Sequence, residues 1–321
     1  MSANRKYFPH GSVLFVSSRT EQGLPLVCSL LMNFIIWGIL AKARSMYRIK
    51  VCHFVFMSNH LHMILVVESP QDVSRFMGYV KGEIAHAVNR LLGRRQRTIW
   101  QAGYDSPHLL TADDVVSKIR YIYGNPVSAR LVHTIEEYPG VSSWEMFAKG
   151  EHSRKHQSLP RDLIPALVLP ALSITEQKRM LEQFQELELN EFEFVLEPDA
   201  WRKELGAELE YPNEALIEDI EDYQRELKSE RLDKNQPVLG ATSLRRESML
   251  KEYQPKKYSR KMICISSDKE LRRRFIAHFK ALAALAAEAY QSWKFGCYKL
   301  KIPPGMFCPR MPETVSALSV L

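Results

Sequence analysis

The chain has 321 residues, 45% of them hydrophobic and 25% charged, a balance that is ordinary for a globular protein with a buried core. Its formal net charge of +7 and its pI near 9.1 favour a polyanionic partner, nucleic acid first. The five cysteines are odd in number and form no Cys-x-x-Cys pair, which argues against a disulfide framework and a cysteine zinc site. No signal peptide is visible, so we expect a reducing, cytoplasmic location.

The length predicts about two domains of roughly 150 residues each. We expect the first over residues 1–150, because the composition changes near residue 150. The polar stretch 151–161 is interpreted as a linker to an extension, 151–321, which is mainly helical, acidic in its first half and basic in its second. Contact with nucleic acid is one expectation for this extension, and a solvated charged surface is the alternative.

The chain opens with a candidate strand at 12–19, followed by an apolar helix at about 25–46. A membrane span would need about 20 predominantly apolar residues. Polar residues interrupt this run, and Lys42 and Arg44 close it, so a helix buried against a sheet is the better interpretation. The next stretch, 48–57, is apolar at nearly every position, as in a central strand covered on both faces.

A second strand with two histidines follows a short turn at Ser58-Asn59 and completes a β-hairpin. Because strand side chains alternate between faces, His60 and His62 point the same way, whereas Leu61 points into the opposite, apolar face. Two imidazoles on one face supply two ligands of a divalent metal site. Two ordinary half-buried histidines are the alternative.

The rest of the first domain predicts two helices and one strand. A capping box opens the second helix, and Asn125-Pro126 ends it, because the residue before proline disfavours helical angles. The order β-α-β-β-α-β-α predicts an α+β fold, a ferredoxin-like split βαβ sheet of four strands backed by helices. In chain order these elements are a helix at about 71–93, the basic loop Arg94-Arg95-Gln96-Arg97, an edge strand at 98–110 and a helix at 111–124.

Tyr121 and Asn125 lie four residues apart in the last turn of that helix and project from the same side. Tyr123 is about 200° from Tyr121 around the helix axis and faces elsewhere. A phenol and an amide oxygen brought over the histidine strand would supply a nucleophile and a third metal ligand. Mixed nitrogen and oxygen ligands suit Mg²⁺ or Mn²⁺ with open water positions, as phosphoryl chemistry requires.

The two motifs together resemble those of a known family, the single-tyrosine HUH transposases of the insertion-sequence type. The REP-associated tyrosine transposases are the closest group, and the resemblance covers roughly residues 7–147. It is carried by Asn59-His60-Leu61-His62, by Tyr121-Ile122-x-x-Asn125-Pro126-Val127, and by the runs Leu131-Val132, Tyr138-Pro139 and Ser142-Ser143-Trp144.

This resemblance implies that His60, His62 and Asn125 ligate a divalent metal, Mg²⁺ or Mn²⁺, and that Tyr121 attacks a DNA phosphate. It implies a nickase and strand transferase that acts on single-stranded or hairpin DNA through a 5′-phosphotyrosine intermediate. The family includes monomers and swapped homodimers, so both arrangements stay open. One departure is Gly124, which we expect to loosen the last turn of the helix by up to ~1 kcal/mol.

Several basic residues are further candidates for contact with DNA. Lys118 and Arg120 flank Tyr121 and are able to neutralise the scissile phosphate, with exposed helix charge as the alternative. For the loop arginines Arg94, Arg95 and Arg97, phosphate contact and a solvated loop are equally plausible.

Aromatic residues and a third histidine are open to two interpretations. Trp100, Tyr104 and Phe8 are able to stack on unpaired bases, at ~1–3 kcal/mol per base, but we favour the sheet core for Trp100. His53 is interpreted as structural, because its position in the strand does not place it with the metal pair.

The extension contains a possible helical hairpin. A helix at 214–230, a turn at 235–240 and a helix near 242–252 would present Arg245 and Arg246 to a duplex stem.

A long helix follows the hairpin. A capping box from Ser267 to Glu270 opens it, it runs from Leu271 to about Phe295, and the tail at 302–309 wraps the body.

Two functions from different classes remain. The first is a metal-dependent enzyme that cuts and joins single-stranded DNA, as a transposase or its domesticated relative. The second is a protein that binds a nucleic-acid hairpin with the same fold and no cleavage. The presence of Tyr121, both histidines and Asn125 favours the enzyme.

Overall fold

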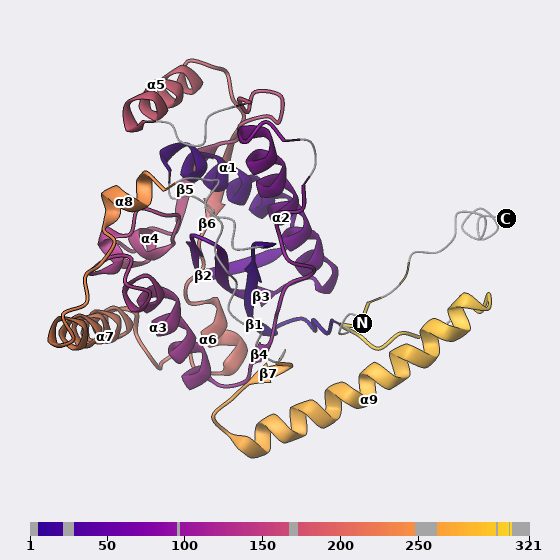
Figure 1. Cartoon of the computed structure of the whole chain (residues 1–321). Helices are drawn as coiled ribbons and strands as arrows, with labels where there is room; N and C mark the ends of the chain where they lie inside the picture. The colour runs from indigo at the N-terminus through magenta and orange to yellow at the C-terminus, as the bar shows by residue number, and fades with distance from the viewer. Residues whose placement is uncertain are drawn as a thin grey trace.

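The computed structural model describes residues 6–21, 29–94, 97–166, 173–247, 262–299, 301–307 and 309 (Figure 1). Arg95, the start of the helix predicted at 25–46 and the second part of the helix predicted near 242–252, from residue 248 on, lie outside these residues.

Five strands form the main sheet, in the order β2-β3-β1-β4-β7. All neighbouring pairs are antiparallel except β4 and β7. The order of the first four strands is that of a ferredoxin-like split βαβ sheet, so the predicted fold is confirmed. The fifth strand is added from the extension. The bounds are β1 (Val13–Arg19), β2 (Ile49–Met57), β3 (His60–Val67), β4 (His108–Leu109) and β7 (Cys264–Ile265).

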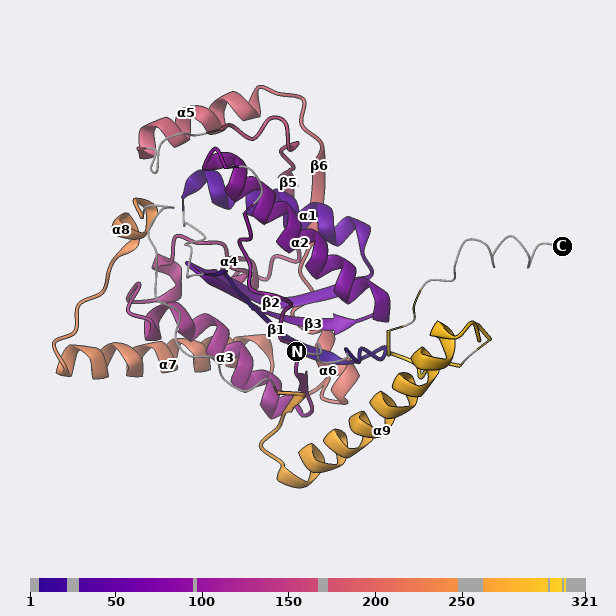
Figure 2. The ribbon, with the colours of Figure 1, turned by 45° about the vertical axis from the view of Figure 1, so that its right-hand side comes forward.

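Helices cover both faces of this sheet (Figure 2). On one face lie α1 (Leu30–Met46) and α2 (Pro70–Leu91), and on the other lie α3 (Ala112–Ser128), α6 (Ala200–Leu205) and α7 (Asn213–Asp233). The strands β2 and β3 are buried at almost every position, as a sheet covered on both faces requires. The central position predicted for the strand at 48–57 is wrong, because β2 lies at the edge of the sheet, next to β3. Within the described residues, no helix is both long and apolar enough to cross a membrane.

The remaining elements are short except for one helix. Their bounds are η2 (Ile135–Glu137), α4 (Trp144–Ala148), β5 (Ser153–Gln157), α5 (Ile174–Gln185), β6 (Glu191–Val195), α8 (Ala241–Arg245) and α9 (Lys269–Lys294).

The edge strand predicted at 98–110 is confirmed only in part, because β4 is the one regular strand among these residues and β7 pairs with it on its outer side. The chain otherwise meets β1 and its end through single bridges, Ser17 to Asp105 and Thr20 to Trp100. The ammonium of Lys81 donates to backbone carbonyls of this segment, which replaces strand partners. The Trp100 indole donates to the carbonyl of Lys81 at 2.9 Å and is buried, so the core position favoured for Trp100 is confirmed.

The helix α3 does not stop at Asn125-Pro126, as the sequence predicted, but continues to Ser128. Proline lacks the N–H of a helical residue, so the helix loses one hydrogen bond there. Pro126 and Val127 are buried, and the N–H of Ala129 donates to the carbonyl of Asn125 at 2.9 Å. Packing therefore carries the helix one turn further, and Asn125 lies inside it.

The sequence predicted a capping box at the N-terminus of α3 and another at the N-terminus of α9. The box of α3 is present, with Thr111 Oγ1 accepting from the N–H of Asp114 at 3.2 Å and the Asp114 carboxylate accepting from the N–H of Thr111 at 3.1 Å. In α9 the N-cap is Asp268 rather than Ser267, because the Asp268 carboxylate accepts from the N–H of Glu270 at 2.8 Å. The N-cap of α9 therefore lies one residue later than predicted.

The linker predicted at 151–161 is also wrong, because β5 pairs there with β6 in a second, two-stranded sheet. This ribbon packs on α1. The His156 ring stacks on Trp37 with centroids 4.6 Å apart, and a Cβ on Gly38 would lie 2.4 Å from the carbonyl oxygen of Gln157. A polar sequence still forms a strand here because its backbone pairs and its long side chains cover the α1 surface.

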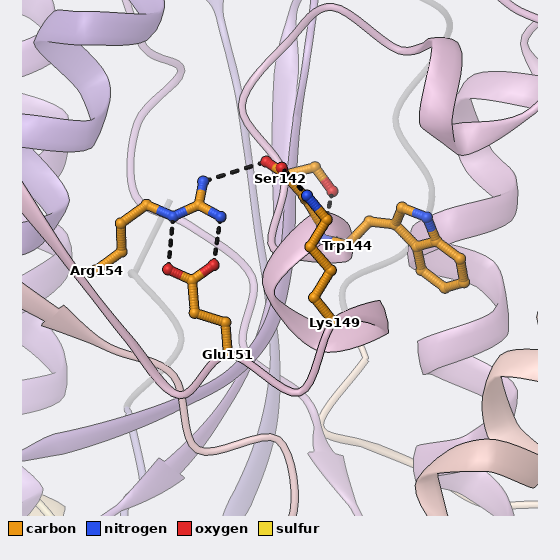
Figure 3. Close-up of polar contacts among 6 residues, drawn as sticks. Ser142, Trp144, Lys149, Glu151 and Arg154 are labelled. Carbon is orange, nitrogen blue, oxygen red and sulfur yellow. Dashed lines mark hydrogen bonds and ion pairs between the residues drawn. The ribbon is translucent and has the colours of Figure 1, made fainter.

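Ion pairs tie this ribbon to α4 (Figure 3). The Arg154 guanidinium donates to Glu151 at 2.9 Å and to Glu145 at 3.2 Å, and Lys149 donates to Glu145 at 2.7 Å. Charged side chains thus bridge the segment around residue 150. A domain boundary at that residue stays a prediction.

The long helix α9 lies at the side of the molecule (Figures 1 and 2). Ala286 is its one buried residue among those described. The tail after it does contact the body, as predicted, because the N–H of Phe8 donates to the carbonyl of Gly305 at 2.8 Å and Met306 forms a bridge with Tyr7.

Candidate metal and tyrosine site

The histidine strand β3 lies between β1 and β2, and its register decides which residues surround the histidines. On β1, Ser17 lies opposite His62 and Arg19 lies opposite His60. Directly paired residues of a sheet share a face, so these four side chains lie together. We call this side of the sheet the site face. The helix α3 crosses it and contacts both β2 and β3.

His62 is buried at the centre of the site face. Its ring stacks on Phe15 with centroids 5.2 Å apart and an interplanar angle of 14°. Burial, together with the positive charges of Arg19 and Lys118, holds the pKa of His62 well below its ordinary value. The ring is therefore neutral at pH 7. Neither ring nitrogen has a hydrogen-bond partner, a deficit of about 1–3 kcal/mol for each buried group.

His60 lies beside His62, with ring centroids 4.8 Å apart. Its Nδ1 bonds Asn59 Oδ1 at 2.7 Å, which places the proton on Nδ1 and leaves the Nε2 lone pair free for a ligand. The Asn125 amide nitrogen lies 3.4 Å from His60 Nε2, and a half-turn of that amide brings its oxygen to the same place. Burial lowers the pKa of His60 to about 4.

The structure brings Tyr121 to this pair and keeps Tyr123 away. The Tyr121 ring centroid is 5.2 Å from that of His62, and its side chain is 41% exposed. Tyr123 is fully buried and bonds His53 Nδ1 at 2.8 Å and Ser143 Oγ at 2.9 Å. The two tyrosines therefore face different surroundings, as the helical spacing predicted.

Burial raises the pKa of Tyr121 above its ordinary value, while the charge of Arg19 opposes this rise. The Lys118 ammonium lies 5.1 Å from the Tyr121 ring centroid and 5.4 Å from that of Phe15. Burial also lowers the pKa of Lys118. Tyr121 is therefore a neutral phenol at pH 7, with cationic groups on two sides.

His53 is structural, but the reason inferred from the sequence is wrong. It pairs with Ile64, which shares a face with His62, so His53 does lie on the site face. The pairing from Met57–His60 to His53–Ile64 is regular, so plain alternation along β2 gives His53 this face, and the bulge between Val51 and His53 changes only the residues before it. Its bond to Tyr123 and its complete burial keep it in the core.

Of the other predicted basic residues, Arg120 already has partners on α7. It pairs with Asp219 at 3.7 Å and Glu226 at 3.8 Å, and its guanidinium lies 4.4 Å from the Tyr223 ring centroid. Arg94 and Arg97 follow α2, the helix on the opposite face of the sheet from the site face. Arg245 and Arg246 lie at the end of α8, half-buried and exposed respectively.

The aromatic candidates are also partnered. Phe8 is buried, and Tyr104 lies under the Lys6 ammonium, which is 4.0 Å from its ring centroid.

Gly124 does not merely loosen α3, as expected from the sequence. A Cβ at this position would lie 2.5 Å from Cε1 of Tyr223, so the missing side chain makes room for a ring of α7. Tyr223 belongs to α7, so the extension packs directly on the helix that carries Tyr121. No local pattern in the sequence connects residues a hundred positions apart.

The donor set fits a divalent metal ion. The unpartnered nitrogens of His62 and the oriented Nε2 of His60 supply two neutral ligands. In the described part of the chain, no three His, Cys, Asp or Glu side chains gather to hold a metal, and the group nearest to His60 Nε2 is the Asn125 amide.

Sequence reasoning missed three residues of the site. Asn59 belongs to the hairpin turn, and its position directly before His60 was a usable signal. Phe15 and Arg19 come from β1, and only the register of β1 against β3 reveals them.

Comparison with known proteins finds similarity to a family model and to solved structures. Residues 32–125 match the family model described as IS200-like transposase. A solved structure, described as a REP-associated tyrosine transposase bound to a REP hairpin, is similar with 21% sequence identity and a TM-score of 0.40, covering 50% of this chain and 90% of that chain. No curated protein sequence matches the chain. The family match spans His60, His62, Tyr121 and Asn125, and over it the resemblance to insertion-sequence transposases is confirmed.

Proposed function

Since residues 32–125 are similar to the IS200-like transposases, we propose that this chain is a metal-dependent endonuclease and strand transferase for single-stranded DNA. It acts at DNA hairpins through a 5′-phosphotyrosine intermediate, as a transposase or a domesticated relative. One observation carries the proposal: a half-exposed phenol lies beside two neutral imidazoles whose lone pairs lack strong partners.

The residues of the site have distinct roles in this proposal. The ring nitrogens of His60 and His62 and the amide oxygen of Asn125 would hold Mg²⁺ or Mn²⁺, which when bound polarises a phosphate oxygen and stabilises the leaving 3′-oxygen. Asn59 orients the His60 ring, and Phe15 orients the His62 ring by stacking.

Tyr121 is the nucleophile. Its oxygen forms a bond to phosphorus while the bond from phosphorus to the 3′-oxygen breaks, and the 3′-oxygen ends as a hydroxyl. The phenol proton leaves to solvent, which reaches the 41% exposed side chain. The number of phosphodiester bonds is unchanged, so the same centre joins strands in the reverse reaction without ATP.

The exposure of Tyr121 also supports a single-stranded substrate. Solvent reaches Tyr121, and an unpaired strand can bend its backbone toward the phenol, whereas a duplex holds its backbone in a fixed stack. The two histidines and Tyr121 meet within one chain, which is compatible with a monomer. Whether the chain is a monomer or a homodimer stays a prediction.

The test uses DNA hairpins taken from the flanks of the gene, each with single-stranded arms, incubated with the full chain and Mn²⁺. We expect a covalent protein–DNA adduct that survives denaturing electrophoresis. Tyr121→Phe should abolish it. Tyr123→Phe, the matched control on the same helix, should retain it if the protein stays folded.

Two outcomes would contradict the proposal. Loss of the adduct in Tyr123→Phe with retention in Tyr121→Phe would move the nucleophile. Tight hairpin binding by the wild type without any adduct would favour the alternative, a hairpin-binding protein that has the fold without cleavage.

A further inference from the structure

Arg19 is the last residue of β1 and lies directly opposite His60 in the strand register. Hydrogen bonds fix the backbone around it, because the carbonyl of Arg19 accepts from the N–H of Gln101 at 2.9 Å and the N–H of Thr20 donates to Asn59 at 2.9 Å. The side chain itself is exposed. A backbone fixed by hydrogen bonds thus presents an exposed guanidinium at the rim of the site face.

The charge around Arg19 is unbalanced. Within the described residues, Arg19 takes part in no ion pair, whereas Arg120, the residue before Tyr121, pairs with two carboxylates of α7. The histidines, Tyr121 and Asn125 are neutral at pH 7. An exposed arginine beside neutral groups lacks the anion that its planar fork of donors fits best.

A second cation lies farther along the same strand. The Lys118 ammonium is over the ring of Phe15, four residues before Arg19 on β1 and on the same face. Four residues of strand span about 13 Å. Ser17, opposite His62, lies midway between them. A strand of DNA laid across His62 would therefore meet a positive charge on each side.

We propose that Arg19 binds a backbone phosphate of single-stranded DNA at the His60 end of the site face and sets the register of the strand against Tyr121. This inference rests on the proposed function for its substrate. Arginine binds phosphate with two parallel N–H donors, so it holds the position of the strand as well as its charge. At the Phe15 end of the site face, the Lys118 ammonium attracts a second phosphate as a point charge.

The first experiment measures binding without cleavage. Tyr121→Phe protein, free of metal, is titrated with a mixed-sequence single-stranded oligonucleotide at several salt concentrations. Adding Arg19→Gln should weaken binding by about tenfold to a hundredfold and reduce the slope of log affinity against log salt by about 0.7, the value for one single-strand phosphate contact. Arg19→Lys should keep the slope and lose part of the affinity.

The control is Arg75→Gln. Arg75 lies on α2, on the opposite face of the sheet, and this variant removes the same charge. If Arg75→Gln and Arg19→Gln lower the affinity and the slope equally, the effect is only one of net charge, and the inference is wrong.

The second experiment separates this inference from the proposed function. With Mn²⁺ and hairpin DNA, Arg19→Gln on the Tyr121-containing chain should form the covalent adduct at least tenfold more slowly, or at shifted positions in the arm. Normal adduct formation at normal positions, together with an unchanged salt slope, would overturn the role of Arg19 and leave the nuclease intact. If the slope of log affinity against log salt depends on Arg19 but no variant forms an adduct, the proposed nuclease activity is wrong and the phosphate contact of Arg19 is supported.

Discussion

The extension contains two long helices, α7 and α9, and they relate to the rest of the molecule in opposite ways. The helix α7 buries Leu216 and Ile220 against the body and seats Tyr223 on Gly124 of the helix that carries Tyr121. The helix α9 is longer but buries only Ala286 among its described residues. One helix is part of the scaffold of the site, and the other lies beside it.

This difference shows that a helix outside the family match still shapes the candidate site. The contact between α3 and α7 combines apolar burial, the pairs of Arg120 with α7 carboxylates, and the close approach at Gly124. The attachment of α9 uses a few aromatic contacts, such as Phe275 against His108 with centroids 4.8 Å apart. Substitutions in the two helices should therefore have unequal consequences.

We expect the largest loss of stability from truncating a buried side chain of α7. Ile220 is 1% exposed, so Ile220→Ala removes buried methyl groups and leaves a cavity. We expect the free energy of unfolding to fall by about 2–5 kcal/mol, measured by urea denaturation. A loss below about 0.5 kcal/mol would show that α7 contributes little to the fold and would remove the contrast with α9.

A lower pH should destabilise the protein through His108, which lies on β4 and contacts Phe275 of α9. Burial lowers the pKa of His108 to about 4, from an ordinary value of 6.5. The unfolded chain therefore binds more protons than the folded chain between pH 6.5 and about 4, so there is no penalty above pH 6.5 and stability falls as the pH drops through this window.

His108→Gln keeps a donor for the carbonyl of Tyr7 and removes the titrating group. Relative to this variant, the wild type should lose an additional ~1–3 kcal/mol of stability between pH 6.5 and 4, measured by urea denaturation at each pH. Parallel pH curves for the two proteins would contradict the assignment of this titration to His108.

Because α7 approaches α3 closely at Gly124, the effect of Gly124→Ala on stability should depend in sign on the presence of Tyr223. In the wild type, Gly124→Ala forces the Tyr223 ring to move and should cost about 1–2 kcal/mol, although alanine favours the helix. In a Tyr223→Ala background the same change should stabilise by up to ~1 kcal/mol. A double-mutant cycle by urea denaturation measures the difference, and equal effects in both backgrounds would mean that the two residues are not coupled.

The smallest effect is expected in α9. Leu285 is 54% exposed, so Leu285→Ala should change the free energy of unfolding by less than about 0.5 kcal/mol. It is the matched counterpart of Ile220→Ala, an aliphatic residue truncated in a long helix of the same extension. A loss comparable to that of Ile220→Ala would mean that α9 is packed in solution against a surface not present in this structure.

Prediction from the sequence succeeded where neighbours along the chain decide the outcome. The hairpin, the common direction of His60 and His62, and the separation of Tyr121 from Tyr123 follow from strand and helix periods. It failed at Pro126, where burial outweighed one missing hydrogen bond, and at 151–161, where backbone pairing with a distant strand formed β5. It also assigned His53 to the wrong face, although regular alternation along β2 places it on the site face.

The sequence alone thus determined which residues are available for chemistry and on which side of their own element they lie, because those properties depend on spacing within one strand or helix. Only the tertiary structure decided that Phe15 and Arg19 join the histidines and that Tyr223 occupies the space left by Gly124. Strand register and the packing of distant segments bring these groups together, and both depend on residues far apart in the sequence, so no short stretch of the chain predicts them.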